Sequence, residues 1–196
     1  MAQPPKNKKQ LIFEEAAKLF QEKGYNAASM RDLADRVNLK ASSLYSHIRK
    51  KEEILQKICF DNAHRFVEGI DVIEKLSTDP VEQVQELIRL HIRIALENPT
   101  SVTVFNDEWK HLEEPFLSDF LDLRKNYESR FKAIIQKGIE TGQLKTVNPS
   151  IALFTLITSV RWLHYWNPKH EAVSRTALES DILNLLLGGL RNPNHF

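Results

Sequence analysis

The sequence lacks several features that define whole classes of protein. It has one cysteine, Cys59, which excludes a disulfide bond within the chain and a cysteine-rich zinc site, and is typical of a cytosolic protein. Six glycines and eight prolines are too few for a fibrous or low-complexity chain. No run of eighteen apolar residues is present, and the polar first ten residues lack the apolar core of a signal peptide. We therefore expect a soluble, globular, cytoplasmic protein with no membrane segment.

Motifs of catalysis and metal binding are also absent. The chain has no glycine-rich phosphate loop, no Gly-x-Ser-x-Gly turn, no His-Glu-x-x-His pair and no cluster of cysteine and histidine. Its seven histidines are scattered, and no two lie four positions apart, the spacing at which one helix face could hold a metal ion. We therefore predict no catalytic residue, no metal and no cofactor, with an all-α enzyme or scaffold left open as a third interpretation.

The net charge of +1 is the sum of two unlike parts. Residues 1–53 contain eleven Lys and Arg against seven Asp and Glu, a net charge of +4. The remaining residues contain 16 basic against 19 acidic side chains, a net charge of −3. A basic segment ahead of a slightly acidic one favours a module that binds a polyanion. A chance fluctuation of surface charge is the alternative.

Apolar residues recur at helical spacing along almost the whole chain, and no strand-like alternation of useful length interrupts them. Capping and stopping residues mark the boundaries: Asp79-Pro80 and Asn148-Pro149 begin helices, and Gly142 ends one. The pattern predicts an all-α chain of about nine helices with no internal repeat. The predicted helices cover about residues 11–24, 29–37, 41–48, 49–73, 80–98, 101–112, 116–141, 149–166 and 174–190.

Two short predicted helices joined by a tight turn follow a longer one in the basic segment, which is the pattern of a helix-turn-helix. Asn38 is the non-glycine residue best suited to a positive φ in that turn. The third helix would present a thin polar face to the major groove, and other groups, with the backbone amides near Ser29, would donate to phosphates. The groove-facing candidates are Lys40, Ala41, Ser42, Ser43, Tyr45 and Ser46, and the phosphate-facing side chains are Tyr45, His47 and Lys51.

The basic segment also carries residues in a specific order and spacing. They read Ile12-x-x-x-Ala16-Ala17-x-Leu19-Phe20-x-x-x-Gly24-Tyr25, then Ser29-Met30-Arg31-Asp32-Leu33-Ala34, then Leu39-x-x-x-Ser43-Leu44-Tyr45-x-His47-Ile48-x-x-Lys51-Glu52-x-x-Leu55. This run resembles the DNA-binding segment of the TetR family of transcriptional repressors.

The resemblance implies a homodimer with N-terminal DNA-binding heads. Its helical body would bind an inducer and dimerise through the last two helices. We expect a helix-turn-helix domain at residues 1–53 and a ligand-binding and dimerisation domain at residues 54–196. Together, the resemblance and the outer face of the third helix give the DNA-binding candidates Ser29, Met30, Lys40, Ser42, Ser43, Tyr45, His47 and Lys51.

Three positions depart from the family's usual pattern. Asn38 stands where glycine is usual, Lys40 where serine is usual, and Ser42 where glycine or a similar small residue is usual. Loss of the serine cap should cost the third helix about 1 kcal/mol of local stability. In return, Lys40 adds a donor for a phosphate or a guanine.

Alternatives stay open for individual side chains in this segment. Tyr45 could pack on Phe20 or Tyr25 instead of contacting DNA. Arg31 and Arg36 are expected on a solvated face rather than at base edges.

The later chain is rich in aromatic side chains, most of which we expect in the core, while the composition permits a hydrophobic pocket. It contains Trp162-Leu163-His164-Tyr165-Trp166-Asn167-Pro168, Ser174 and Leu185-Leu186-Leu187-Gly188-Gly189-Leu190, preceded by Arg130-Phe131-x-x-Ile134-Ile135-x-x-Gly138-x-x-x-Gly142. This looks like the C-terminal domain of TetR members that control fatty-acid, phenylacetate or sterol degradation. The resemblance implies an acyl-coenzyme A thioester as the inducer.

An acyl chain would need an apolar tunnel, and the coenzyme A phosphates would need cations at its mouth, for which Arg89 and Arg161 are among the candidates. Arg161 interrupts an otherwise apolar predicted helix, so it faces either the pocket or an ion pair at the dimer interface. A lone histidine such as His91 is often a satisfied core residue. The ligand-binding candidates are His91, Phe105, Trp109, Phe120, Tyr127, Arg161 and Trp162.

The sequence therefore predicts a homodimeric repressor that binds a palindromic DNA operator and responds to a small molecule, with genes of fatty-acid or acyl-coenzyme A metabolism as its targets. A repressor that senses drug-like cations is the alternative. Such a sensor needs carboxylates facing its cavity, whereas the acids here cluster around loop-like stretches. These acids are Asp107, Glu108, Glu113, Glu114, Asp119 and Asp122.

Overall fold

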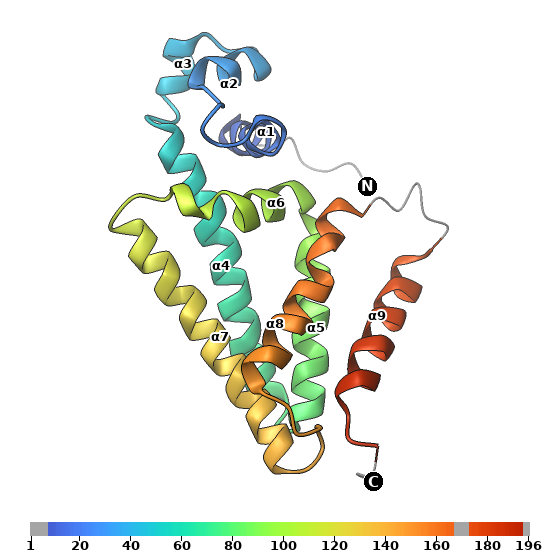
Figure 1. Ribbon diagram of the computed structural model, residues 1–196. Helices are drawn as coiled ribbons and strands as arrows, with labels where there is room; N and C mark the ends of the chain where they lie inside the picture. Colours follow the sequence, from blue (N-terminus) through green and yellow to red (C-terminus); the bar gives the residue numbers. More distant parts are fainter. Residues whose placement is uncertain (1–7, 167–172, 194–196) are drawn as a thin grey trace. The chain divides into compact units, whose positions relative to one another are not determined.

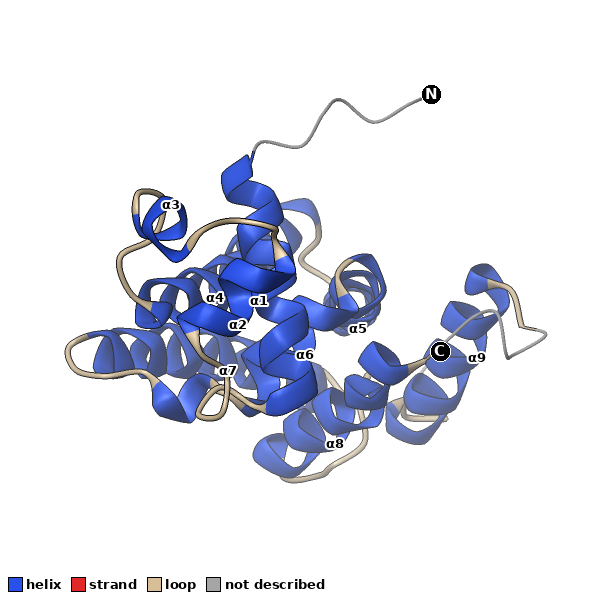
Figure 2. Cartoon of the chain, turned by 90° about the horizontal axis from the view of Figure 1, so that it is seen from above, coloured by secondary structure: helices blue, strands red, loops and turns tan. Residues whose placement is uncertain are grey.

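The computed structural model describes residues 8–166 and 173–193, and every regular element within them is a helix, as Figure 1 and Figure 2 show. This confirms the predicted all-α class. In these residues there are nine α-helices and two 3-10 turns: α1 (Lys8–Lys23), α2 (Met30–Arg36), α3 (Ala41–Tyr45), α4 (Lys51–Leu76), α5 (Pro80–Glu97), α6 (Pro99–Asp107), η1 (Trp109–His111), α7 (Phe116–Glu140), α8 (Pro149–Arg161), η2 (Trp162–Tyr165) and α9 (Arg175–Leu190). None of the described helices is both long enough and apolar enough to cross a membrane.

The helix starts follow the capping residues. The Ser29 hydroxyl accepts the Asp32 amide at 3.1 Å while the Asp32 carboxylate accepts the Ser29 amide at 3.0 Å, a reciprocal cap at the start of α2. The side chains of Asp79 and Asn148 cap α5 and α8, each followed by proline at the first helical position. In the turn before α3, Asn38 has the predicted positive φ, 51°.

Several helix boundaries differ from the expected ranges, since α1 begins at Lys8 rather than Leu11 and α4 ends at Leu76 rather than Ile73. α3 ends at Tyr45 rather than Ile48, since the Ser46 hydroxyl donates to the Ser43 carbonyl at 2.7 Å and competes with the helical bonds. The predicted helix 101–112 is divided into α6 and η1, and the one at 149–166 tightens into η2. The predicted stop at Pro168 lies outside the described residues.

The chain forms two compact units. Unit 1 comprises Met1–Asn62 and Thr100–Leu121, and unit 2 comprises Ala63–Pro99 and Asp122–Phe196. α4 and α7 each contribute to both units. The domain boundary expected after residue 53 separates DNA binding from ligand binding and dimerisation, whereas the two units are separated by their contacts. The expected boundary stays a prediction.

In unit 1, α2 packs against α1 and α3 (Figure 1). Leu33 and Ala34 are the buried residues of α2, as expected for a helix that must lie flat on its neighbours. Leu44 is the buried residue of α3.

In unit 2, α5 packs against α8, η2 and α9. α4 approaches α5 closely at Gly69, where an added methyl group would overlap the Leu90 side chain. Arg130 on α7 binds Asp71 at 2.7 Å and Glu74 at 2.5 Å, both on α4. These contacts link α4, α5, α7, α8 and α9 in this unit.

Candidate nucleic-acid interface and effector site

α3 presents a polar face to solvent. Leu44 and Ile48 are 0% and 1% exposed and anchor the helix and the turn that follows it. The predicted DNA-binding residues of this segment are all exposed: Lys40, Ser42, Ser43, Tyr45 and His47. A short helix anchored on one side and polar on the other has the form needed to enter a major groove.

Tyr45 is 50% exposed, whereas Phe20 and Tyr25 are buried and pack edge to face with ring centroids 5.2 Å apart. The two rings thus pack on each other, and no ring contact supports the alternative in which Tyr45 packs on Phe20 or Tyr25. The contact of Tyr45 with DNA stays a prediction.

Ser29 and Met30 lie at the start of α2. The Ser29 hydroxyl also donates to the Asp32 carboxylate at 2.6 Å, and Lys23 donates to the same carboxylate at 3.0 Å. These hydrogen bonds, with those of Ser29 first, lower the pKa of Asp32 to about 2. Ser29 is thus already engaged in the cap, and Met30 is partly buried.

Lys51 has a role that its position in the sequence did not indicate. Its ammonium group donates to the carbonyls of Tyr25 at 2.9 Å and Ala28 at 3.1 Å, and it lies 4.4 Å from the centre of the Tyr25 ring. The side chain therefore ties the start of α4 to the segment between α1 and α2. No local sequence pattern predicts these hydrogen bonds, because the donor and its acceptors are 23 or more positions apart.

α1 is joined to α6 and η1 within unit 1. Gln21 donates its amide to the Thr103 hydroxyl at 3.0 Å. Tyr25 stacks on His111 with ring centroids 5.5 Å apart, and burial raises the pKa of Tyr25. The helix that supports the DNA-binding pair thus contacts residues far along the chain, which sequence reasoning missed.

Three of the ligand-binding candidates meet in unit 1. Phe120 is buried, with Phe105 at 5.7 Å and Trp109 at 5.9 Å between ring centroids. Phe60 of α4 joins them at 6.2 Å from Phe120. The buried Cys59 beside Phe60 in sequence is not a reactive group, since burial raises the pKa of its thiol to about 12.

Two further candidates meet in unit 2. His91 Nε2 and the Tyr127 hydroxyl are 2.8 Å apart, and Phe66 packs on the His91 ring at 4.6 Å between centroids. Desolvation lowers the pKa of His91 to about 4, so the imidazole is neutral at pH 7. The interpretation of His91 as a satisfied polar residue in an apolar setting is supported by this hydrogen bond.

Arg161 and Trp162 do not join either group of aromatic residues. Both are exposed, Trp162 at 45%, and the indole donates to the Ser159 carbonyl at 2.8 Å. Arg161 is therefore not a buried guanidinium. The helix on which it lies is largely apolar, but one side of that helix is exposed.

In the described residues, no three His, Cys, Asp or Glu side chains are grouped so that they could hold a metal ion.

Two known families match the sequence. Residues 12–58 match the bacterial regulatory proteins of the tetR family. Residues 77–190, more than half of the chain, match the tetracyclin repressor-like C-terminal domain.

Individual relatives cover nearly the whole chain. The HTH-type transcriptional repressor KstR2 of Mycolicibacterium smegmatis is 23% identical over 188 residues, 95% of this chain and 92% of the relative. The structure of the ketosteroid transcriptional regulator KstR2 of Mycobacterium tuberculosis superposes with a TM-score of 0.88 at 21% identity, covering 97% of this chain and 98% of that one. AibR in complex with isovaleryl coenzyme A and operator DNA superposes with a TM-score of 0.79 at 21% identity, covering 92% and 98%. The chain belongs to the TetR family, which confirms the predicted family and the predicted class of ligand-responsive, DNA-binding transcriptional repressor.

Proposed function

We propose that this repressor is released from its operator by an acyl-coenzyme A thioester and controls genes of fatty-acid or related lipid degradation. The observation that carries the effector class is the likeness to AibR, whose structure contains isovaleryl coenzyme A and operator DNA together, over 92% of this chain. The likeness to KstR2, a ketosteroid regulator, over 97% of the chain supports the lipid-related targets. Since its relatives are regulators, we infer that the chain acts in the cytoplasm and not as an enzyme.

The DNA contacts follow from the exposed face of α3. Ser42, Ser43 and Lys40 are short or flexible donors that suit base edges and phosphates of the major groove. Tyr45 and His47 flank this face and suit the phosphate backbone. We assign Lys51 an indirect role, because its ammonium protons already point at backbone carbonyls.

We propose that the homodimer forms through α8 and α9. Ile151 and Phe154 lie three positions apart on one face of α8, Trp162 begins η2 directly after it, and all three are exposed in the single chain. Leu185 on α9 is 77% exposed. Exposed apolar side chains grouped in this way are typical of a protein–protein interface. Arg161 sits at the end of the same helix, which favours its alternative role at the dimer interface.

The effector would act through α4. This helix is continuous from Lys51 to Leu76, with its first part in unit 1 and its second part in unit 2. A ligand that binds better to one position of α4 shifts the population toward that position. Through Lys51, the segment before α2 would follow the first turn of α4.

A thermal-shift screen tests the effector class. Acyl-coenzyme A esters of varied chain length are compared with a panel of cationic drugs, using the full-length protein. We expect stabilisation by at least one thioester and none by the drugs. Stabilisation by cations alone would favour the multidrug alternative, and footprinting that shows no protected palindrome near its own gene would contradict the repressor proposal.

A further inference from the structure

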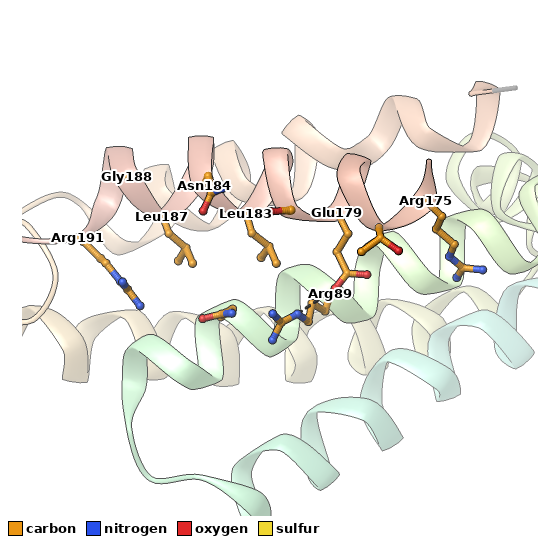
Figure 3. Close-up of a pocket in the computed structure, with 11 residues that line it drawn as sticks. Arg89, Arg175, Glu179, Leu183, Asn184, Leu187, Gly188 and Arg191 are labelled. Atoms are coloured by element: carbon orange, nitrogen blue, oxygen red, sulfur yellow. Dashed lines mark hydrogen bonds and ion pairs between the residues drawn. The ribbon is translucent and has the colours of Figure 1, made fainter. Parts of the chain in front are cut away.

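A cleft lies between α5 and α9 in unit 2, as Figure 3 shows. Its volume is about 590 Å³, which is within the range of sites for small molecules. The lining residues come from α5 and from α9 with the residue that follows it, and none is among the seven predicted ligand-binding residues. Arg89 was expected as a cation for the coenzyme A phosphates, but its partner wall on α9 could not be predicted, because Arg89 and Glu179 are ninety positions apart.

The cleft has an excess of positive charge. Three arginines line it, Arg89, Arg175 and Arg191, against one carboxylate, that of Glu179. The rest of the wall is mainly uncharged and polar, with the buried Leu183 and Leu187 supplying apolar surface. This excess occurs although residues 54–196 carry a net charge of −3.

The three arginines differ in how far they are already satisfied. Arg89 binds Glu179 at 3.0 Å and Glu86 at 2.5 Å, so two carboxylates balance its charge. In the described part of the chain, Arg175 and Arg191 form no direct ion pair with a carboxylate, although the charge of Arg191 helps to lower the pKa of Asp79. Arg175, and in part Arg191, can therefore attract an anion that enters the cleft.

The positions of these arginines favour an extended ligand. Figure 3 shows the side chains of Arg175 and Arg191 directed from α9 toward α5, near opposite ends of the cleft. Sixteen positions along a helix correspond to about 24 Å. A long molecule with anionic groups at separate places fits this arrangement better than a single small anion.

We propose that the α5–α9 cleft binds the phosphate groups of a coenzyme A thioester. This inference rests on the effector class proposed above and names the part of the chain that recognises the nucleotide end. Guanidinium groups form paired, charge-assisted hydrogen bonds with phosphate oxygens. The apolar surface of Leu183 and Leu187 suits the uncharged parts of the same ligand.

Calorimetric titration of the full-length protein tests the proposal. The probes are coenzyme A, its 3′-dephospho form, ADP, inorganic phosphate and pantetheine, which carries no phosphate. We expect coenzyme A to bind at least tenfold more tightly than pantetheine. Arg175→Gln and Arg191→Gln should each weaken coenzyme A binding by about tenfold, the typical loss for one charge-assisted hydrogen bond. Arg93→Gln, an exposed change on α5 outside the cleft, is the matched control and should have no effect.

A gain-of-function variant separates binding from a structural role. Glu179→Gln removes the only carboxylate of the cleft and frees Arg89 from one of its two partners. We expect this variant to bind coenzyme A more tightly, by several-fold. A merely structural role of the Arg89–Glu179 pair would give no such gain.

The outcomes are distinct. Coenzyme A binding that is unchanged in the Arg175→Gln, Arg191→Gln double variant would overturn the proposal, as would ADP or inorganic phosphate binding as tightly as coenzyme A. If an acyl-coenzyme A releases DNA from wild type and double variant at the same concentration, the effector class stands and the cleft assignment falls. If coenzyme A binds through these arginines but no thioester releases DNA, the cleft stands and the effector class falls.

Discussion

Lys51 joins the start of α4 to the segment between α1 and α2. Its ammonium group donates hydrogen bonds to the carbonyls of Tyr25 and Ala28 and lies over the Tyr25 ring. These carbonyls follow the end of α1, where helical partners are lacking. The ammonium group thus helps to hold the segment that leads into α2, together with the ring contacts of Tyr25.

Replacing Lys51 by Met tests that role. Because the variant keeps the length of the side chain and removes its hydrogen bonds, we expect the free energy of unfolding to fall by about 1 to 2 kcal/mol. Operator affinity should fall too, with an unchanged salt dependence. Urea unfolding and binding titrations at several salt concentrations measure both.

The neighbouring exposed Lys50→Met is the control for loss of a positive charge. If Lys51→Met left stability unchanged and lowered the salt slope of operator binding by about 1 per site, Lys51 would be a direct phosphate contact instead.

His91 makes the stability of the chain depend on pH. Its pKa is about 4 in the folded protein, below the ordinary value of 6.5, so the unfolded chain binds a proton more readily. The contribution is complete above pH 6.5 and is lost as the pH falls toward 4. We expect a loss of about 2 kcal/mol over this range that His91→Gln removes.

Denaturant unfolding at pH 7 and pH 4.5 measures this effect. His47→Gln, at an exposed position, is the matched control and should keep the full pH dependence. The same pH dependence in His91→Gln as in wild type would show that His91 is not the group responsible.

At the scale of the element, α3 combines weak local stability with exposure. It has five residues, one buried side chain and no side-chain cap at Lys40. The missing cap was predicted from the sequence, and the structure confirms it. Lys40 thus lacks the stabilising cap that a serine would provide, and it places a positive charge beside the residues predicted to face the groove.

Lys40→Ser and Lys40→Ala separate the two consequences. We expect Lys40→Ser to stabilise the head by about 1 kcal/mol through a new cap and Lys40→Ala not to. Both should weaken operator binding at low salt, because each removes a positive charge. Amide exchange in α3 and binding titrations provide the measurements. Unchanged operator affinity in both variants would mean that Lys40 does not contact DNA.

Local features of the elements could be predicted from the sequence, and long-range ones could not. The caps formed by Asp79 and Asn148 and the positive φ of Asn38 depend on residues within a few positions of each other. The bond from Gln21 to Thr103 and the α5–α9 cleft each join residues more than eighty positions apart. Periodicity within one helix contains no information about which distant helix supplies the partner.

At the scale of the whole molecule, the net charge of +1 is the sum of +4 on residues 1–53 and −3 on the rest of the chain. The basic first 53 residues contain the helix-turn-helix, and the body carries the candidate effector residues. A dimer with two helix-turn-helix heads reads two half-sites, so we expect the proposed interface on α8 and α9 to be as necessary for DNA binding as α3 itself.

Leu185→Glu tests the proposed interface. A charge at this exposed position should leave the fold of one chain intact and prevent dimerisation, since it would be buried unpaired between two copies. We expect sedimentation to show a monomer and operator affinity to fall at least a hundredfold, while the helical circular dichroism is unchanged. Val72→Glu, exposed on α4, is the matched control. A dimer that persists in Leu185→Glu would place the interface elsewhere.

Release of DNA by the effector is the most direct test of the proposed function. Fluorescence anisotropy of a labelled operator bound to the wild-type protein is followed while acyl-coenzyme A esters of increasing chain length are added, with free coenzyme A, free fatty acids and cationic drugs as controls. We expect at least one thioester to lower the anisotropy to that of free DNA, at a concentration where the controls do not. Release by a cationic drug and by no thioester would contradict it.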